Sequence, residues 1–219
     1  MQQRKVVDTK QLVVVSMLCA LAYASVALFR LPVVMFLSYE PKDCILAICG
    51  MLYGPIPAVV SAVVVALLEM VTISQTGPIG ALMNMLSTVL FILPCSILYQ
   101  RRRTLKHAVI GLLVGMVLMV AGMLLWNWIV TPWYMGVTRS EIEQLLVPVF
   151  LPFNAFKAAM NTTLTILLYK AVVTTLRKAR LVPPADAQGN RKISIGLLVI
   201  GLVLLAALIL VWLVWRGLL

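Results

Sequence analysis

Apolar runs of about 20 residues, the length of a helix that spans a bilayer, follow one another along most of this chain. The runs are continuous, whereas the strands of a transmembrane barrel would alternate apolar and polar residues. Hydrophobic residues make up 63% of the 219 residues, and a soluble domain has too small an interior to bury that fraction. The sequence therefore predicts an all-α integral membrane protein.

The runs also predict how the chain is divided. We expect a six-helix membrane domain over residues 11–178, a polar linker over 179–192 and one additional C-terminal transmembrane helix over 193–215. Two of the six helices share the run 44–71, in which a Gly-Pro turn predicts a short helix followed by a longer one. The other four predicted helices are 12–29, 79–99, 108–130 and a last one that begins at 145 and ends between 169 and 176.

Basic residues fall mainly between alternate runs, which predicts the orientation of the chain. The larger share of the 18 lysines and arginines lies before the first run and at 101–106, 170–180 and 191–192. By the positive-inside rule these segments are cytoplasmic, so the N-terminus lies inside and, after seven spans, the C-terminus lies outside. The net charge of +11 then reflects the multi-pass topology of a cell-membrane protein, and no nucleic-acid partner is expected.

The reactive residue types argue against an enzyme or a metal protein. The four cysteines form no CxxC pair and lie in or beside apolar runs, as small buried hydrophobic residues do. The single histidine, His107, cannot make a histidine-based metal site. Glu69 is the only acidic residue inside a predicted span, so paired carboxylates for acid–base chemistry are lacking. We therefore expect neither a catalytic centre nor a metal site.

A polar stripe interrupts the last of the six predicted helices. Asn154 lies three residues before Lys157 and Asn161 lies four residues after it, so all three share one helical face. Polar groups at membrane depth are costly and usually face a cavity or a partner. The stripe predicts one wall of a ligand pocket, although a lysine this near the interface could also snorkel to water.

Three further polar residues fall toward the same predicted outer end. Asn127 lies between two tryptophans, and it is either an interhelical contact or a ligand contact beside an aromatic belt. Asn84 follows a Gly-Pro helix entry, where it either caps the entry or faces the ligand. Glu69 either pairs with Lys157 or contacts solvent, because an uncompensated carboxylate there would be costly.

The first external loop, 31–43, is apolar for a segment outside the membrane, and it contains Tyr39. It either lies flat on the interface or covers the mouth of a pocket and excludes water. Because polar side chains of several helices converge at one end, the sequence predicts an outward-facing pocket. Its ligand would be a small, partly aromatic molecule that forms hydrogen bonds.

Small residues at a four-residue spacing predict close helix contacts in two runs. Ala20 and Ala24 have this spacing in the first run, and Gly111 and Gly115 have it in the fifth. Because alanine is frequent in this chain, the pattern in the first run could equally reflect ordinary packing within the bundle.

Taken in order, these residues resemble the substrate-binding S component of energy-coupling factor (ECF) vitamin transporters, and the riboflavin-specific branch in particular. The similarity extends over residues 13–176, and its most specific part is the LPFN-xx-K motif at 151–157. The weaker matches are MLCALAYA at 17–24, Asp43 before the short helix, Gly54-Pro55, Gly80 with Asn84, and Asn127 between aromatic residues.

The resemblance implies a six-helix bundle that binds riboflavin from outside as its transported ligand, with no cofactor. Asn127 and Lys157 would contact the hydrogen-bonding edge of the isoalloxazine ring, and the first loop would cap the pocket. Ala20 and Ala24 would face a transmembrane coupling subunit. The resemblance also implies two ATPase subunits that drive it. The chain itself has no GxxxxGK motif followed by Ser or Thr, so any ATP hydrolysis would be done by partners. The other candidate ligand-binding residues are Asn84, Asn154, Glu69 and Tyr39.

Three alternatives remain open. The chain could be an S component for another vitamin or for the flavin nucleotides FMN and FAD. It could be a membrane assembly protein without a ligand, in which case no ligand would stabilise it. It could also be an intramembrane enzyme, although the acid–base and metal-binding residues that such an enzyme needs are missing.

Overall fold

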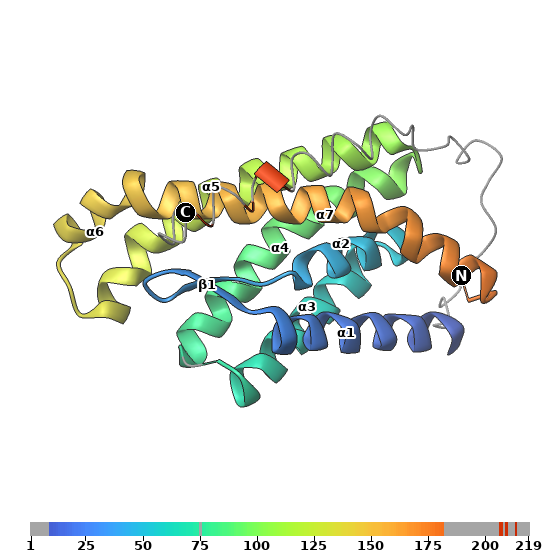
Figure 1. The fold of residues 1–219 in the computed structure, drawn as a ribbon, viewed down its shortest axis with the longest axis horizontal. Coiled ribbons are helices and arrows are strands. Elements are labelled where there is room, and N and C mark those ends of the chain that lie inside the picture. Colours follow the sequence, from blue (N-terminus) through green and yellow to red (C-terminus); the bar gives the residue numbers. More distant parts are fainter. Residues whose placement is uncertain (1–8, 75, 182–205, 208, 210–212, 214–219) are drawn as a thin grey trace, which may run out of the picture.

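The computed structural model describes residues 9–74, 76–181, 206–207, 209 and 213. Over these residues the chain folds into helices and one short β-hairpin (Figure 1). The helices α1 (Thr9–Phe29), α3 (Pro55–Thr72), α4 (Gly77–Arg101) and α5 (Leu105–Met135) are long and apolar enough to cross a membrane. The remaining elements are α2 (Lys42–Tyr53), α6 (Arg139–Leu145), α7 (Leu151–Lys178), the π-helical turn η1 (Leu146–Phe150), and the strands β1 (Leu31–Val34) and β2 (Leu37–Tyr39).

The predicted helical membrane-protein class is confirmed by these apolar helices. The predicted linker, 179–192, is described only as far as residue 181. Most of the predicted additional helix, 193–215, also lies outside the described residues. The division into a six-helix domain, a linker and an additional helix therefore stays a prediction.

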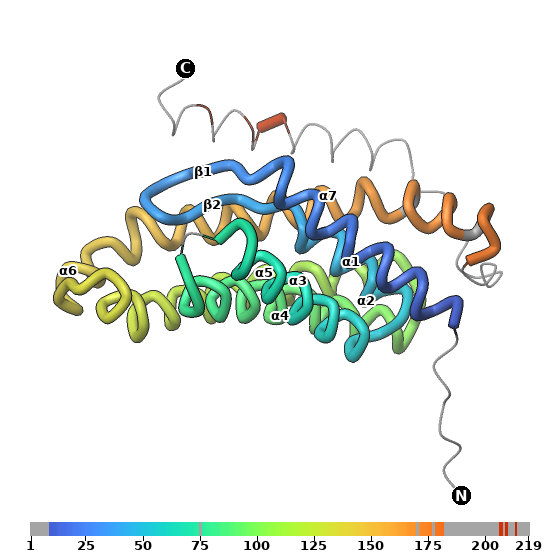
Figure 2. The backbone as a smooth tube through the Cα atoms, turned by 90° about the horizontal axis from the view of Figure 1, so that it is seen from below, coloured from blue at the N-terminus to red at the C-terminus, as the bar shows by residue number. Residues whose placement is uncertain are grey.

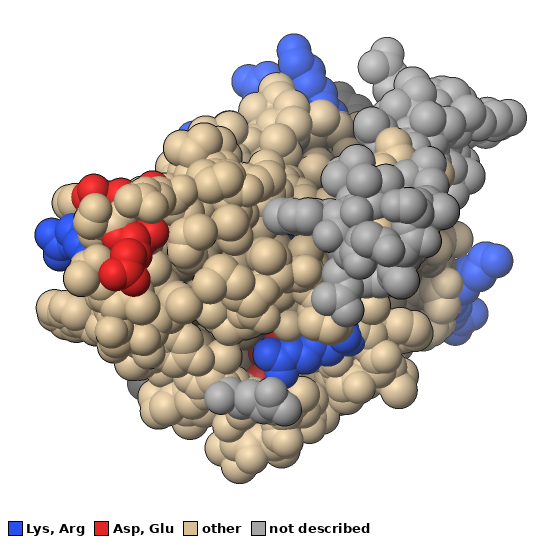
Figure 3. Space-filling model, turned by 60° about the vertical axis from the view of Figure 1, so that its left-hand side comes forward, with Lys and Arg blue, Asp and Glu red and all other residues tan. Residues whose placement is uncertain are grey.

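The two ends of the bundle differ in chemistry. Figure 1 shows the start of α1, the connection from α4 to α5 and the end of α7 at one end, and the hairpin tip and α6 at the other. The first end carries the basic segment 101–106, which the charge pattern predicts to be cytoplasmic. On the face drawn in Figure 3, charged side chains gather at a few places with uncharged surface between them.

A turn at Gly54 separates α2 from α3, as the Gly-Pro motif predicts. Gly54 has a φ of +94°, a backbone conformation that glycine adopts at little cost and other residues avoid. Pro55 is the first residue of α3, where its missing N–H loses no helical hydrogen bond. The predicted short helix followed by a longer one is thus confirmed. All the residues of α2 from Lys42 to Met51 are buried.

The backbones of α4 and α5 approach each other closely. A Cβ atom placed on Gly115 would lie 2.3 Å from the carbonyl oxygen of Phe91, and one on Gly111 would lie 2.7 Å from the Cα atom of Cys95. A residue larger than glycine would therefore push the two helices apart at either position. The helix contact predicted from the small-residue spacing in the fifth run is confirmed.

The first loop is a β-hairpin, so the prediction of an all-α fold is wrong for this segment. β1 and β2 pair antiparallel, with Leu31 opposite Tyr39 and Val34 opposite Leu37. The pairing satisfies backbone N–H and C=O groups that an irregular segment on an apolar surface would leave without partners. The inward side chains of the hairpin pack against aromatic residues of η1 and α7, along which the hairpin lies in Figure 2.

The sixth predicted span is interrupted near its start. α6 ends at Leu145, the π-helical turn η1 follows, and α7 begins at Leu151. Pro148 lies within the turn and Pro152 lies just after it. Because proline donates no backbone hydrogen bond, the regular α-helical ladder cannot continue through this stretch. The predicted span from residue 145 is thus divided at its two prolines, and its regular α-helical part begins at Leu151.

We expect Gly115→Ala to weaken the packing of α5 on α4. The added methyl group would displace the Phe91 backbone, and overpacking of this kind costs about 1–3 kcal/mol. Thermal unfolding of the purified protein in detergent should occur at a lower temperature. Gly122→Ala is the matched control, because its methyl group would meet only the flexible end of Leu90. Equal unfolding temperatures for Gly115→Ala and the wild type would contradict the close approach.

Candidate ligand-binding site

The polar stripe predicted on the last helix is buried in α7. Asn154, Lys157 and Asn161 have relative exposures of 2%, 3% and 0%. The ammonium of Lys157 therefore does not snorkel to the surface in this structure. A buried ammonium requires partners of opposite charge or hydrogen-bond acceptors, and α2 supplies one.

The partner of Lys157 is Asp43, a fully buried carboxylate in the first turn of α2. Lys157 Nζ lies 3.8 Å from Asp43 Oδ2, and Asn161 Nδ2 donates a hydrogen bond of 2.9 Å to the same oxygen. Thr88 Oγ1 of α4 donates to Asp43 Oδ1 at 2.6 Å. The Tyr39 hydroxyl donates to Asn161 Oδ1 at 3.1 Å. This Asp43 cluster, Asp43 with Tyr39, Thr88, Lys157 and Asn161, joins the hairpin, α2, α4 and α7.

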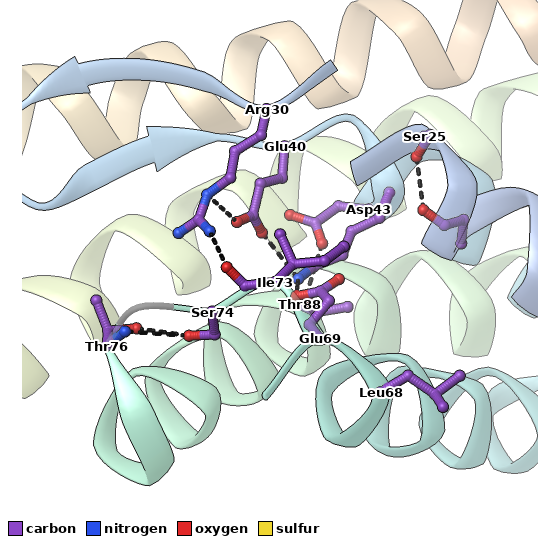
Figure 4. Close-up of polar contacts among 12 residues, drawn as sticks. Ser25, Arg30, Glu40, Asp43, Leu68, Glu69, Ile73, Ser74, Thr76 and Thr88 are labelled. Carbon is purple, nitrogen blue, oxygen red and sulfur yellow. Dashed lines mark hydrogen bonds and ion pairs between the residues drawn. The ribbon is translucent and has the colours of Figure 1, made fainter. Parts of the chain in front are cut away.

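A second group of buried charges lies beside the Asp43 cluster (Figure 4). Lys42 Nζ lies 2.8 Å from Glu40 Oε2 and also contacts Glu69 Oε2. Arg30 Nε lies 3.5 Å from Glu40 Oε1, and the Arg30 guanidinium donates to the carbonyl oxygen of Ile73 at 3.2 Å. We call Arg30, Glu40, Lys42 and Glu69 the ionic cluster. It joins the base of the hairpin to α2 and α3.

Glu69 pairs with Lys42, so neither predicted alternative for Glu69, pairing with Lys157 or contact with solvent, is correct. Lys42 lies within the predicted external loop, 31–43, but in the structure it begins α2 and has a relative exposure of only 2%. A carboxylate as buried as Glu69 needs a cation, and Lys42 supplies it. Burial raises the pKa of the Glu40 carboxyl, but the nearby cations Lys42, Lys157 and Arg30 together outweigh burial and hold that pKa below its ordinary value.

A cavity opens between the hairpin, α4, α5 and α7. The free space between its lining residues is about 410 Å³ with the open solvent at its mouth included, and the predicted residues Asn84, Asn154 and Lys157 line it. Arg30 and Glu40 of the ionic cluster line it as well. Amide, ammonium, guanidinium and carboxylate groups thus border one space, which is the arrangement expected of a pocket for a polar organic ligand.

A second cavity, with about 250 Å³ of free space when the open solvent at its mouth is included, adjoins the first. The two share Phe36, at the tip of the hairpin, with Thr76 and Met83. Trp126 and Tyr134 of α5 line the second cavity, and the ring centroids of Tyr134 and Phe36 lie 5.5 Å apart in an edge-to-face contact. The two spaces therefore combine a polar part with an aromatic part.

Three predicted ligand-binding residues, Glu69, Tyr39 and Asn127, do not line either cavity. Glu69 belongs to the ionic cluster, and Tyr39 belongs to the Asp43 cluster. Asn127 is fully buried; its Nδ2 atom donates to the carbonyl oxygen of Met123 at 2.7 Å and its Oδ1 atom accepts from Thr131 at 2.8 Å. Met123 lines the larger cavity and Thr131 the smaller, so Asn127 lies between them with its amide bonded within α5.

Sequence reasoning missed five polar residues that line the larger cavity: Arg30, Ser38, Glu40, Thr76 and Ser87. The two charged residues resemble ordinary charges of an exposed loop, because nothing in the sequence marks the base of the hairpin as buried. Ser87 could have been predicted from its spacing, since it lies three residues after Asn84 and therefore on the same face of α4.

Other residue types with potential chemistry are dispersed. Cys44, Cys49 and Cys95 are buried and Cys19 is half-buried, which agrees with their predicted role in packing. Within the described parts of the chain, no group of three His, Cys, Asp or Glu side chains could hold a metal ion.

The predicted partner-binding alanines lie on the outer side of α1. Ala20 is exposed and Ala24 is partly exposed. Val14, Leu18 and Ala22 occupy the opposite side of the helix and are buried in the bundle. The face that carries the two alanines is therefore not used for packing within the described part of the chain, and a neighbouring helix could reach it.

The chain resembles known membrane transport proteins over most of its length. Residues 10–169 match the family model described as ECF transporter, substrate-specific component. The chain is 28% identical over 173 residues to the riboflavin transporter FmnP of Bacillus subtilis (strain 168), covering 73% of this chain and 90% of the relative. It is 25% identical over 179 residues to the riboflavin transporter RibU of Staphylococcus aureus (strain TCH60), covering 78% of this chain and 94% of the relative.

A solved structure has a similar fold. That structure is of the S component of a bacterial ECF transporter. Its TM-score to this chain is 0.67 at 25% sequence identity, and the match covers 77% of this chain and 98% of the other.

We expect Lys42→Met to destabilise the protein, because it leaves Glu40 and Glu69 buried without their shared cation. Removing one partner of a buried ion pair costs about 3–5 kcal/mol. Thermal unfolding in detergent measures the loss. Arg30→Gln is the matched control and should lose less, because the Arg30 side chain is 25% exposed. If both variants unfolded at the same temperature, the pairs of Lys42 with Glu40 and Glu69 would not stabilise the protein more than the partly exposed Arg30 does.

Proposed function

Because the chain belongs to the family of ECF transporter substrate-specific components, we propose that it binds riboflavin in the cavity between the hairpin, α4, α5 and α7. This assigns it the role of a membrane transport subunit. The observation that carries the proposal is the convergence of Asn84, Asn154 and Lys157 on one cavity that adjoins an aromatic one. Two relatives that are named riboflavin transporters support the choice of vitamin.

The two cavities match the chemistry of a flavin. The isoalloxazine ring is flat, with hydrogen-bonding groups along one edge and methyl groups on the other. Amide side chains offer both donors and acceptors, and the ammonium of Lys157 offers further donors. The cavity lined by Phe36, Trp126 and Tyr134 would receive the apolar edge. Asn127 would join the contacts if its amide turned from α5 toward the ligand.

The buried charges around the cavity favour a neutral ligand. Three cationic and three carboxylate side chains pair there with one another: Arg30, Lys42, Lys157, Glu40, Asp43 and Glu69. An anionic ligand would have to take a cation from a buried carboxylate, which would then be left without compensation. Riboflavin is uncharged, whereas FMN and FAD carry phosphate, so the balance of charges favours riboflavin.

One observation favours a flavin nucleotide instead. Arg30 lines the cavity with a side chain that is 25% exposed, and guanidinium groups bind phosphate in a bidentate manner. An Arg30 side chain released from Glu40 could receive the phosphate of FMN. Binding measurements with both flavins distinguish the two candidates.

We place the cavity at the outer side of the membrane and the basic end of the bundle in the cytoplasm. Riboflavin would then be captured from outside a bacterial plasma membrane. By the family resemblance, its release inside would involve a transmembrane coupling subunit and two ATPase subunits. The face of α1 with Ala20 and Ala24 is the proposed contact for the coupling subunit.

We expect the purified protein to quench riboflavin fluorescence on titration, and Lys157→Met to weaken binding about ten-fold or more, equivalent to about 1.4 kcal/mol. Methionine keeps the apolar volume of the lysine stem but removes the donors. It also leaves the buried Asp43 without its cation, so thermal unfolding of the variant is measured beside binding. FMN should bind the wild type less tightly than riboflavin. Lys106→Met, at the opposite end of the bundle, is the control and should bind riboflavin normally. Unchanged affinity of Lys157→Met would remove Lys157 from the site, and a preference for FMN would favour the nucleotide.

We expect Ala20→Trp and Ala24→Trp to bind riboflavin normally but to stop riboflavin uptake by cells. A bulky side chain on this face of α1 would keep a partner helix at a distance without disturbing the buried side of α1. Uptake of labelled riboflavin and binding to the purified variants are measured side by side. Leu12→Trp, also exposed on α1, is a control for bulk alone. Normal uptake by both alanine variants would exclude this face as the contact.

A further inference from the structure

Ser87 is a buried hydroxyl without a partner in the wall of the larger cavity. It lies in α4, has a relative exposure of 2% and lines the cavity. Among the described residues, no group forms a hydrogen bond with its Oγ atom. Burying a hydroxyl without a hydrogen bond is unfavourable, so such a group in a native fold calls for an explanation.

Two other buried serines in helices behave differently. Ser61 Oγ donates to the carbonyl oxygen of Pro57 at 2.7 Å, and Ser96 Oγ donates to that of Ile92 at 2.7 Å. Both bonds reach back four residues in the same helix, which is the usual way a helical serine satisfies its hydroxyl. The Ser87 hydroxyl does not use this local bond, although its helical position would allow it.

Ser87 lies on the face of α4 that lines the larger cavity. Met83, Asn84 and Ser87 follow one another at helical spacing on α4, and all three line the larger cavity. The next residue, Thr88, donates to Asp43, which also holds Lys157. The Asp43 cluster therefore fixes α4 and α7 relative to each other. Ser87 and Lys157 line the same space from these two helices.

We infer that the Ser87 hydroxyl forms a hydrogen bond with the bound ligand and helps to select a ligand with a polar edge. This inference rests on the proposed function, since riboflavin is the ligand concerned. A hydroxyl both donates and accepts, so Ser87 can bond to a ring carbonyl oxygen, a ring nitrogen or an N–H group. A ligand with only apolar atoms at this position would leave the hydroxyl without a partner and would bind less tightly.

The test is riboflavin titration and thermal unfolding of the Ser87→Ala variant in detergent. Affinity for riboflavin should fall roughly three- to ten-fold, the usual effect of losing one hydrogen bond. The unfolding temperature of the ligand-free variant should equal or exceed that of the wild type, because the alanine removes a buried hydroxyl that lacks a partner. Riboflavin affinity therefore falls without a fall in the unfolding temperature, whereas a purely structural role for Ser87 would lower both.

Ser96→Ala is the matched control on the same helix. Its hydroxyl bonds within α4, and the residue does not line either cavity, so its riboflavin affinity should equal that of the wild type. Unchanged affinity of Ser87→Ala would overturn the inference. So would a loss of affinity accompanied by an equal loss of ligand-free stability. A wild type that binds no riboflavin would instead overturn the proposed function, and the inference with it.

Discussion

The rest of the site depends on the ion pair and hydrogen bonds that compensate the buried Asp43 carboxylate. A charge with no exposure to water in an apolar bundle is tolerated only when ion pairs and hydrogen bonds compensate it. Here the compensation comes from Lys157 and Asn161 of α7 and from Thr88 of α4. These helices are distant in sequence, so the electrostatic requirement of one side chain brings together the elements that form the cavity walls.

The connection between β2 and α2 carries several of the buried polar residues that hold these elements together. Tyr39, Glu40, Lys42 and Asp43 are four of five successive residues, and each has a relative exposure of 3% or less. Glu40 borders the cavity, Lys42 reaches α3 through Glu69, and Asp43 reaches α4 and α7. The hairpin is therefore held at its base by buried ion pairs. Its tip is held by aromatic contacts, of which that between Phe36 and Tyr134 is one.

Helix periodicity and the cost of buried charge allowed part of this arrangement to be predicted. The stripe of Asn154, Lys157 and Asn161 was predictable because one helix carries all three at fixed spacing. The partner of Glu69 was not, because Lys42 lies in a segment whose burial depends on contacts far along the chain. The hairpin was missed for a related reason, since its short strands pair only with each other and show little alternation.

The amide of Asn127 illustrates a further limit of sequence reasoning. A polar residue between tryptophans near a helix end is an obvious candidate for ligand contact, and the structure does place Asn127 between the two cavities. Its hydrogen bonds, however, run along its own helix to Met123 and Thr131. Residue type and spacing locate a side chain on a face of a helix, but they do not determine with which of several neighbouring groups it forms hydrogen bonds.

The π-helical turn before α7 sets the rotational phase of everything that follows it. Such a turn takes up one residue more than an α-helical turn, and each residue of an α-helix advances the phase by about 100°. Removing one residue from 146–150 while keeping α6 in place would turn α7 by that angle. An apolar neighbour of Lys157 would then face Asp43. Gains or losses of single residues should therefore be rarer in this short stretch than in the connection between α5 and α6.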